Sequence, residues 1–317
     1  MIIKDSIVLK NSNLEVSRLC FGGCPMGRHG WGNTVKQSFV DAINLAVNKG
    51  INFFDSADIY GFGEAEKTLG ETVKTYREKV VIATKFGVRN KNGKSFYDNS
   101  PEWIEEALNN SLSRLQTSYI DLYQIHYRDN TPFNVVMEKL ISLKKSGKIR
   151  YIGLSNVFKN DIKVIQAYKS EIVSFQNEFS LAKRNHQDDI AFLSSKMEIT
   201  PMTWGSLGQG VLTGKYSLEN TKFDSNDRRS RDVYYNFHGD KLIHNLNIVE
   251  TMRRISINTS RSISAIAIRW ILDTLPESIV LAGIKNTDQL LSNIEGLEWS
   301  LEKSDIKLLN EVSLYVK

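Results

Sequence analysis

The sequence has few cysteines and no long hydrophobic run, and both shortages exclude classes of protein. Its two cysteines, Cys20 and Cys24, are too few for a disulfide framework or for a zinc site built from cysteine alone. We therefore expect free thiols in a reducing compartment and no metal site. No run of about eighteen apolar residues occurs, which argues against a membrane span, and the N-terminus has no signal peptide. These absences predict a cytoplasmic protein.

The chain also lacks a strong excess of charge of one sign. Its net charge is +5, and the positive residues are scattered apart from a small cluster at Arg228, Arg229 and Arg231. Nucleic-acid-binding proteins gather basic residues on one face, so we expect no nucleic-acid partner. The 41% hydrophobic and 24% charged residues are ordinary for a globular protein with a sizeable core. A modest positive balance favours an anionic ligand without identifying one.

Apolar runs and helical patterns alternate along most of the chain. Residues 3–17 alternate apolar and polar side chains around the turn-forming Asn11-Ser12-Asn13, which predicts an N-terminal β-hairpin. Strands that alternate with helices pair in parallel, and eight such units in one domain of this size fit an α/β fold, the closed (β/α)8 TIM barrel. The expected strands lie at residues 19–21, 51–54, 80–85, 120–126, 149–154, 172–175, 199–204 and 278–284.

We therefore predict one domain over residues 1–317, with extra C-terminal helices from residue 287 onward. A doubly wound open sheet is the alternative fold, and it is disfavoured because no glycine-rich dinucleotide fingerprint follows the first strand. Two segments interrupt the alternation. Residues 88–99 are predicted to form a polar loop, and residues 205–240 form a long connection of the kind that is usually functional or disordered.

Three successive expected strands end in side chains that complement one another chemically. Asp55, Lys85 and His126 stand at these ends, and closure of the barrel brings them to one mouth, within reach of Tyr60 on the second loop. A free tyrosine has a pKa of about 10, and a neighbouring ammonium lowers it. We expect Lys85 to supply that charge, Asp55 to pair with Lys85, and His126 to orient a substrate oxygen. We call Asp55, Tyr60, Lys85 and His126 the acid set, because together they could deliver a proton to a substrate.

Each of these residues also has a plainer interpretation. Asp55 alone fits a helix cap or turn former, Lys85 a solvated strand-end lysine, and His126 a structural histidine. Their joint occurrence at successive strand ends favours catalysis. A Schiff-base role for Lys85, as in a barrel aldolase, is a further alternative, and the nearby Asp55 argues against it because an ion pair keeps the amine protonated.

Three stretches of the sequence resemble the aldo-keto reductases. They are Phe54-Asp55-Ser56-Ala57-Asp58-Ile59-Tyr60-Gly61, Thr84-Lys85-Phe86-Gly87 and Asp121-Leu122-Tyr123-Gln124-Ile125-His126, and the likeness covers nearly the whole chain in order. The resemblance implies a (β/α)8 barrel that binds NADPH without a Rossmann domain. It also implies that Tyr60 is the general acid, that Lys85 lowers its pKa, that Asp55 pairs with Lys85, and that His126 orients the carbonyl.

The resemblance extends to the cofactor site. Ser155, Asn156 and Gln176 match the residues that hold the nicotinamide carboxamide. Trp204 matches an aromatic that stacks on the nicotinamide, although it also fits plain core, and a tryptophan there is similar to the branch that includes potassium-channel β subunits. The remaining implied contacts are Asp55 with Gly22, Gly23 and Cys24 at the first strands, the pyrophosphate stretch Gly205, Ser206, Leu207, Gly208, Gln209 and Lys215 with Arg229 closing over it, and the 2′-phosphate site Gly283, Lys285, Gln289 and Asn293.

The 2′-phosphate site also makes physical sense. Asn286 and Thr287 are expected to open a helix whose terminal N–H groups attract phosphate, and the positive charge of Lys285 favours NADPH over NADH, which stays possible.

We therefore expect an NADPH-dependent reductase of an aldehyde or ketone. A cofactor-sensing regulatory subunit with little turnover is the alternative, kept open by Trp204. The substrate is a small carbonyl compound chosen by the loops. These loops span residues 24–33, 88–99, 127–131 and 216–240, and their polar composition, with Trp31, Tyr97, Tyr234, Tyr235 and Phe237, is compatible with a polar substrate.

Overall fold

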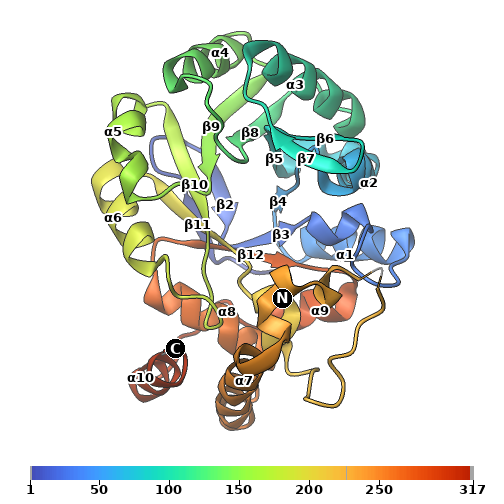
Figure 1. The fold of residues 1–317 in the computed structure, drawn as a ribbon, viewed down its shortest axis with the longest axis vertical. Coiled ribbons are helices and arrows are strands. Elements are labelled where there is room, and N and C mark those ends of the chain that lie inside the picture. Colours follow the sequence, from blue (N-terminus) through green and yellow to red (C-terminus); the bar gives the residue numbers. More distant parts are fainter. Residues whose placement is uncertain (1, 226, 315–317) are drawn as a thin grey trace.

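Eight parallel strands close into a barrel in a computed structural model that describes residues 2–225 and 227–314. Figure 1 shows the barrel from one end, ringed by helices. Sequential strands are neighbours throughout, and the last pairs with the first, Val280 with Leu19, which confirms the (β/α)8 fold. The barrel strands are β3 (Leu19–Gly22), β4 (Phe53–Asp55), β5 (Val81–Phe86), β8 (Ile120–Ile125), β9 (Ile149–Ser155), β10 (Ile172–Glu178), β11 (Thr200–Trp204) and β12 (Ile279–Gly283).

The helices form where apolar side chains recur at helical spacing. In α3 (Pro101–Leu115), Ser100 caps the first turn by accepting a hydrogen bond from the Trp103 N–H, and one face is buried against the strands. The ring around the barrel consists of α1 (Lys36–Asn48), α2 (Glu64–Val73), α3, α4 (Phe133–Lys145), α5 (Ile162–Ile165), α6 (Gln187–Met197), α7 (Gly239–Thr259), α8 (Ile263–Thr274) and α9 (Thr287–Ile294), and α10 (Lys303–Val312) follows.

Side chains of the barrel strands divide between two apolar clusters. Successive residues of a strand point to opposite faces of the sheet. In β4, Phe53 packs inside the barrel and Phe54 packs outward against the helices; in β5, Ala83 and Ile82 divide in the same way. The barrel is therefore filled by side chains, and any ligand site lies at one of its ends.

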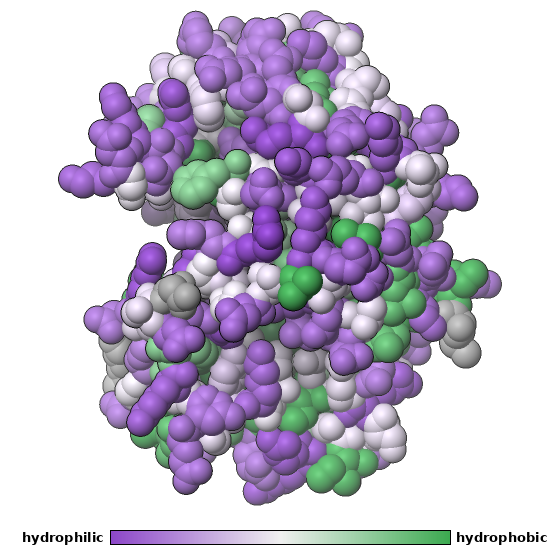
Figure 2. Space-filling model, turned by 90° about the vertical axis from the view of Figure 1, so that its right-hand side faces the viewer, coloured by the Kyte–Doolittle hydropathy of each residue, from purple (hydrophilic) through white to green (hydrophobic). Residues whose placement is uncertain are grey.

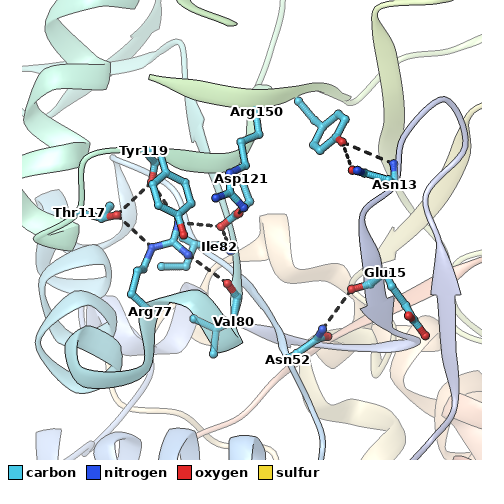
Figure 3. A network of polar contacts seen from close by, with 11 residues as sticks. Asn13, Glu15, Asn52, Arg77, Val80, Ile82, Thr117, Tyr119, Asp121 and Arg150 are labelled. Atoms are coloured by element: carbon cyan, nitrogen blue, oxygen red, sulfur yellow. Dashed lines mark hydrogen bonds and ion pairs between the residues drawn. The ribbon is translucent and has the colours of Figure 1, made fainter. Parts of the chain in front are cut away.

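The amino-terminal end of the barrel is covered by the predicted hairpin. Strands β1 (Ser6–Val8) and β2 (Glu15–Ser17) pair antiparallel, and Leu9 and Val16 join the cluster inside the barrel. The side-chain amide of Asn52, just before β4, donates to the Glu15 carbonyl at 3.1 Å and ties the hairpin to the barrel (Figure 3).

The first residues of β8 carry a second polar network at this end. Asp121 accepts hydrogen bonds from Arg77 at 2.7 Å, from Arg150 at 3.1 Å and from the Ile82 N–H at 2.9 Å. Both guanidinium groups also lie over the Tyr119 ring, at 4.1 and 3.9 Å from its centroid, as Figure 3 shows. These contacts give the buried Asp121 carboxylate its counter-charges and hydrogen-bond donors from the protein itself.

Residues 88–99 are more ordered than the sequence interpretation allowed. They contain an antiparallel hairpin, β6 (Val88–Lys91) and β7 (Lys94–Tyr97), so the prediction of a plain polar loop is wrong. The connection is the two-residue turn Asn92-Gly93, and both residues have positive φ, 53° and 80°. This dipeptide is a strong hairpin signal because it adopts the turn that matches the twist of paired strands.

Residues 205–240 contain short 3-10 helices instead of a long element. They span Gly208–Thr213, Arg228–Ser230 and Asp232–Phe237. No helix in residues 2–225 and 227–314 is long and apolar enough to cross a bilayer. Figure 2 shows a mainly hydrophilic surface on which hydrophobic side chains lie in small groups.

Candidate active site

A cavity of about 800 Å³ opens at the carboxyl ends of the strands and is lined by all four members of the predicted acid set, Asp55, Tyr60, Lys85 and His126. It is also lined by nearly every predicted cofactor residue. Gly208 is the exception, because it packs against Val211 and Ala182. The predicted residues on the cavity wall are Gly22, Gly23, Cys24, Ser155, Asn156, Gln176, Trp204, Gly205, Ser206, Leu207, Gln209, Lys215, Arg229, Gly283, Lys285, Gln289 and Asn293.

The floor of the cavity is a buried ion pair. Lys85 Nζ donates to Asp55 Oδ1 at 2.5 Å and to the Ser56 carbonyl at 3.0 Å, and both charged side chains are almost fully enclosed. Burying either charge alone carries a large desolvation cost, so each requires the other. The ammonium also lies 3.5 Å from the Tyr60 hydroxyl, which places the predicted acid beside the predicted cation.

Tyr60 is held over this pair by a tight turn. It begins a 3-10 helix, Tyr60–Gly63, and Gly61 follows with φ 60°. A Cβ on Gly61 would lie 2.2 Å from the Gly27 carbonyl oxygen, so no larger residue fits there. The Tyr-Gly pair thus lets the second loop approach the first and turns the phenol toward the cavity.

The expected lowering of the Tyr60 pKa is wrong for this structure. Burial of the hydroxyl raises the pKa of Tyr60 well above its ordinary value, and the charges of Cys24 and Asp55 add to that rise. Asp55 lies next to Lys85, and its negative charge offsets the effect of the ammonium on the Tyr60 hydroxyl. The sequence interpretation considered the ammonium alone. The phenol therefore keeps its proton at neutral pH and has it available to donate.

His126 is fixed by its backbone and its neighbours. Its N–H donates to the Phe86 carbonyl at 2.9 Å, and its ring stacks on Tyr127 and meets the edge of Tyr60. Burial, and then the Lys85 charge, lower the pKa of His126 well below its usual value, so the ring is neutral. Its Nδ1 is buried without a partner among the described residues, so a proton on Nε2 leaves no buried donor unpaired. That N–H is then available to a ligand oxygen.

The amides of Gln176 and Asn156 each use both hydrogens within the protein. Gln176 Nε2 donates to Asp55 Oδ2 and to Gln124 Oε1, both at 2.7 Å, and Asn156 Nδ2 donates to the His126 carbonyl at 3.0 Å and to Ser155 Oγ at 3.1 Å. Their carbonyl oxygens remain to accept hydrogen bonds, and the Ser155 hydroxyl hydrogen remains to donate. A primary carboxamide offers two donor hydrogens and one acceptor oxygen, the complement of this set.

Positive charge collects at the other end of the cavity. Burial, then Arg229 and Lys215, lower the pKa of Lys285 to about 8, and burial with Arg229 lowers the pKa of Lys215. The Asp227 carboxylate accepts two hydrogen bonds from the Arg229 guanidinium, at 2.8 and 2.5 Å. Lys285 donates to the Trp31 carbonyl at 2.5 Å. An anion there would relieve the repulsion that the shifts record. The predicted helix follows, with the Asn286 side chain accepting from the Gln289 N–H.

Several lining residues were not singled out from the sequence. Tyr127 follows His126, and Glu178 ends β10 and accepts a hydrogen bond from Gln209 at 3.0 Å. Both follow predicted site residues at strand ends, which was the available signal. Of the predicted loop aromatics, Trp31, Tyr234 and Tyr235 line the cavity. Tyr97 instead stacks on Tyr127, and Phe237 is buried in the core against Tyr216 and Phe223.

Comparison with known proteins agrees with this architecture. A family model described as the aldo/keto reductase family matches residues 18–314. The aldo-keto reductase YhdN of Bacillus subtilis is 33% identical over 310 residues, covering 96% of this chain and 92% of that protein. An NADH-specific methylglyoxal reductase of Escherichia coli is 29% identical over 324 residues, covering 97% and 98%. The solved structure of a glycerol dehydrogenase from Gluconobacter oxydans superposes with a TM-score of 0.87 at 30% identity, covering 97% and 94%.

Proposed function

Because the chain belongs to the aldo/keto reductase family, we propose that it reduces a small aldehyde or ketone to an alcohol with NADPH. One observation carries the proposal: a protonated phenol, a buried ion pair and a neutral imidazole meet in a cavity whose next wall complements a carboxamide. A bound nicotinamide supplies a hydride to the carbonyl carbon.

In this proposal the residues of the chain handle the proton and the substrate oxygen. The His126 Nε2–H donates to the carbonyl oxygen and sets its position, and the Tyr60 hydroxyl passes its proton to that oxygen as negative charge develops on it. The resulting phenolate lies 3.5 Å from Lys85 Nζ, which stabilises it until water returns a proton. Asp55 holds the ammonium in place.

The cofactor is proposed to lie along the cavity from the carboxamide set to the basic end. The oxygens of Asn156 and Gln176 accept from the carboxamide nitrogen, and the Ser155 hydroxyl donates to its oxygen. Trp204 offers an aromatic face at the end of β11, and its Nε1 is buried without a partner among the described residues. The loop from Gly205 to Lys215 with Arg229 receives the pyrophosphate, and Lys285 receives the 2′-phosphate.

The substrate is proposed to be a small polar carbonyl compound. Hydroxyl-bearing side chains and two further carboxylates, those of Glu178 and Asp288, share the cavity with the acid set. Relatives of the chain are named for methylglyoxal and for glycerol, which are small and polar. A panel of aldehydes and ketones, followed by NADPH absorbance with NADH alongside, ranks the candidates. Tight NADPH retention with no turnover of any of them would favour a cofactor sensor instead.

Replacing Tyr60 by phenylalanine tests the proton donor. We expect Tyr60→Phe to lower kcat for the best carbonyl substrate by a factor of about 10²–10⁴, the usual contribution of a positioned acid, and to leave NADPH affinity unchanged. Tyr76→Phe, which removes a hydroxyl bonded to Asn44 outside the cavity, serves as the control. Near-normal turnover by Tyr60→Phe would show that another group donates the proton.

A further inference from the structure

Gln124 is a polar side chain inside the barrel that touches neither the cavity nor solvent. It lies on β8 two residues after Leu122, which belongs to the apolar cluster inside the barrel, and it is 0% exposed. It is absent from the cavity wall, so it meets no ligand directly. Burying an amide here costs stability unless its hydrogen bonds are made, and a leucine would fill the space without that cost.

The hydrogen bonds that Gln124 makes all go to residues of the proposed site. Its Nε2 donates to Asp55 Oδ2 at 3.1 Å, and its Oε1 accepts from Gln176 Nε2 at 2.7 Å. Gln176 also donates to the same Asp55 oxygen at 2.7 Å, so the three side chains form a closed triangle. Asp55 Oδ1 is left to Lys85.

The neighbouring strand is shaped to admit this side chain. Gly153 of β9 pairs with Gln124, and a Cβ on Gly153 would lie 2.9 Å from Gln124 Cγ. A larger residue at 153 would therefore force the Gln124 side chain to shift. The backbone of Gly153 has no positive φ, so its conformation does not require glycine. The small residue instead makes room for the Gln124 side chain.

The triangle joins two parts of the site that act on different molecules. Oε1 of Gln124 occupies one hydrogen of the Gln176 amide, which turns the Gln176 carbonyl oxygen toward the cavity, where the nicotinamide carboxamide is proposed to bind. Nε2 of Gln124 shares the charge of Asp55, the anion that holds Lys85 beside Tyr60. A change at one partner is therefore felt at the other through Gln124 as well as through the direct Gln176–Asp55 hydrogen bond.

We propose that Gln124 is a positioning residue that couples the nicotinamide end of the cofactor site to the Asp55–Lys85 pair. The inference rests on the proposed function for the identity of the cofactor. It assigns Gln124 no contact with substrate or cofactor. Removing it should weaken NADPH binding, because the Gln176 amide then keeps only its hydrogen bond to Asp55 and is less firmly oriented. It should also slow reduction, because Asp55 is less firmly placed.

Two substitutions separate this role from simple packing. Gln124→Leu keeps the volume and removes both hydrogen bonds, and we expect NADPH affinity, measured by fluorescence titration, and kcat each to fall roughly tenfold. Gln124→Glu can rebuild the triangle when protonated, since its hydroxyl donates to Asp55 and its carbonyl accepts from Gln176. Once ionised, it faces Asp55 with like charge.

The Gln124→Glu variant should therefore show a pH dependence in addition to that of wild type, whose own NADPH affinity varies with the charge of Lys285. The charged or titratable groups facing this position are Asp55 on β4, Lys85 on β5 and Cys20 on β3, and Asp55 holds the new carboxyl protonated above its ordinary pKa of about 4.3. NADPH affinity of the variant should equal that of wild type near about pH 5 and fall below the wild-type value at each higher pH. Ser174→Ala, which removes a buried hydroxyl with no partner among the described residues, is the control and should leave affinity unchanged.

The outcomes discriminate between this proposal and the one beneath it. Wild-type protein that binds no NADPH would overturn the proposed function and this inference together. Wild-type NADPH binding, with wild-type affinity in Gln124→Leu and no added pH dependence in Gln124→Glu, would overturn the coupling alone. If Gln124→Leu does not fold, the titration of Gln124→Glu decides, because its protonated form retains the native hydrogen bonds.

Discussion

Two buried aspartates, Asp121 and Asp55, show how differently the two ends of the barrel use polar groups. Asp121 is 1% exposed and Asp55 is 2% exposed, and each is paired with cations and further donors. The partners of Asp121, two arginines and a backbone N–H, do not line the active-site cavity. Among the partners of Asp55, Lys85 and Gln176 face the cavity, and only Gln124 does not.

The difference teaches how a functional end can be recognised. At the amino-terminal end, the donors and acceptors around Asp121 are matched within the chain and the hairpin covers the barrel. At the carboxyl end, side chains are held firmly by some of their atoms while others remain available: the Tyr60 hydroxyl, Nε2 of His126, and the carbonyl oxygens of Asn156 and Gln176. A rigid support with leftover hydrogen-bonding capacity marks a ligand site.

The largest expected effect comes from removing the amino-terminal aspartate. Asp121→Ala leaves Arg77 and the Ile82 N–H buried without their carboxylate, and we expect the free energy of unfolding to fall by about 3–5 kcal/mol. Urea unfolding measures this loss. NADPH affinity should stay at the wild-type value in the folded variant. A loss of NADPH affinity without a loss of stability would break the comparison between the ends.

Much of this fold could be predicted from the sequence because strand and helix periods are local signals. The eight barrel strands and the N-terminal hairpin follow from apolar runs and turn residues, and the structure has them in place. The β6–β7 hairpin was missed because the residues on either side of the turn are too polar to suggest strands. The Asn92-Gly93 dipeptide was the available hairpin signal. Local sequence alone explains both the strands that were predicted and the hairpin that was missed.

The site was predictable in its membership more than in its electrostatics. Strand ends converge in any closed barrel, so Asp55, Lys85 and His126 could be placed together. The pKa of Tyr60 could not be inferred, because it depends on how completely the hydroxyl is enclosed and on how far Asp55 offsets Lys85. Gln124 was not recognised because a single polar residue within an apolar strand gives no sign of its partners, which lie 69 and 52 positions away.

A further buried carboxyl, that of Asp58, lies three residues after Asp55 and sharpens the comparison through pH. Its carboxylate oxygens are buried, and the Ile59 N–H and the Arg114 charge only partly compensate, so that burial and the nearby Glu66 raise the pKa of Asp58 to about 8. The folded state therefore holds this proton at pH values where an unfolded aspartate, with a pKa of about 3.9, has lost it. Its contribution to stability is full below about pH 4 and is lost as pH rises to about 8.

Asp58→Asn should remove that loss. The variant should be more stable than wild type above about pH 8 by a few kcal/mol, with the difference shrinking toward about pH 4. Unfolding midpoints across this range measure the effect, and Asp224→Asn, at an exposed position, is the control. Equal stability of wild type and Asp58→Asn at every pH would show that Asp58 is not held protonated.

Lys285 tests whether charge at the mouth serves a ligand. Lys285→Met removes one of three converging cations, and we expect NADPH affinity to fall roughly 10- to 100-fold while NADH affinity changes little, because a charge-assisted hydrogen bond to the extra phosphate is lost. Lys10→Met, in an exposed ion pair with Glu277 near the hairpin, is the matched control. Equal losses for both cofactors would mean that Lys285 does not recognise the 2′-phosphate.

The smallest expected effect distinguishes the two arginines that share Asp121. The Arg150 side chain is 51% exposed, whereas that of Arg77 is 11% exposed. Water therefore screens the Arg150 pair, and Arg150→Met should cost no more than about 1 kcal/mol in the free energy of unfolding, even though the guanidinium also covers the Tyr119 ring. Arg77→Met leaves the buried Asp121 with only the half-exposed Arg150 as counter-ion, so its cost should be clearly larger. Urea unfolding of the two variants side by side measures the difference, and equal costs would show that burial does not set the strength of this network.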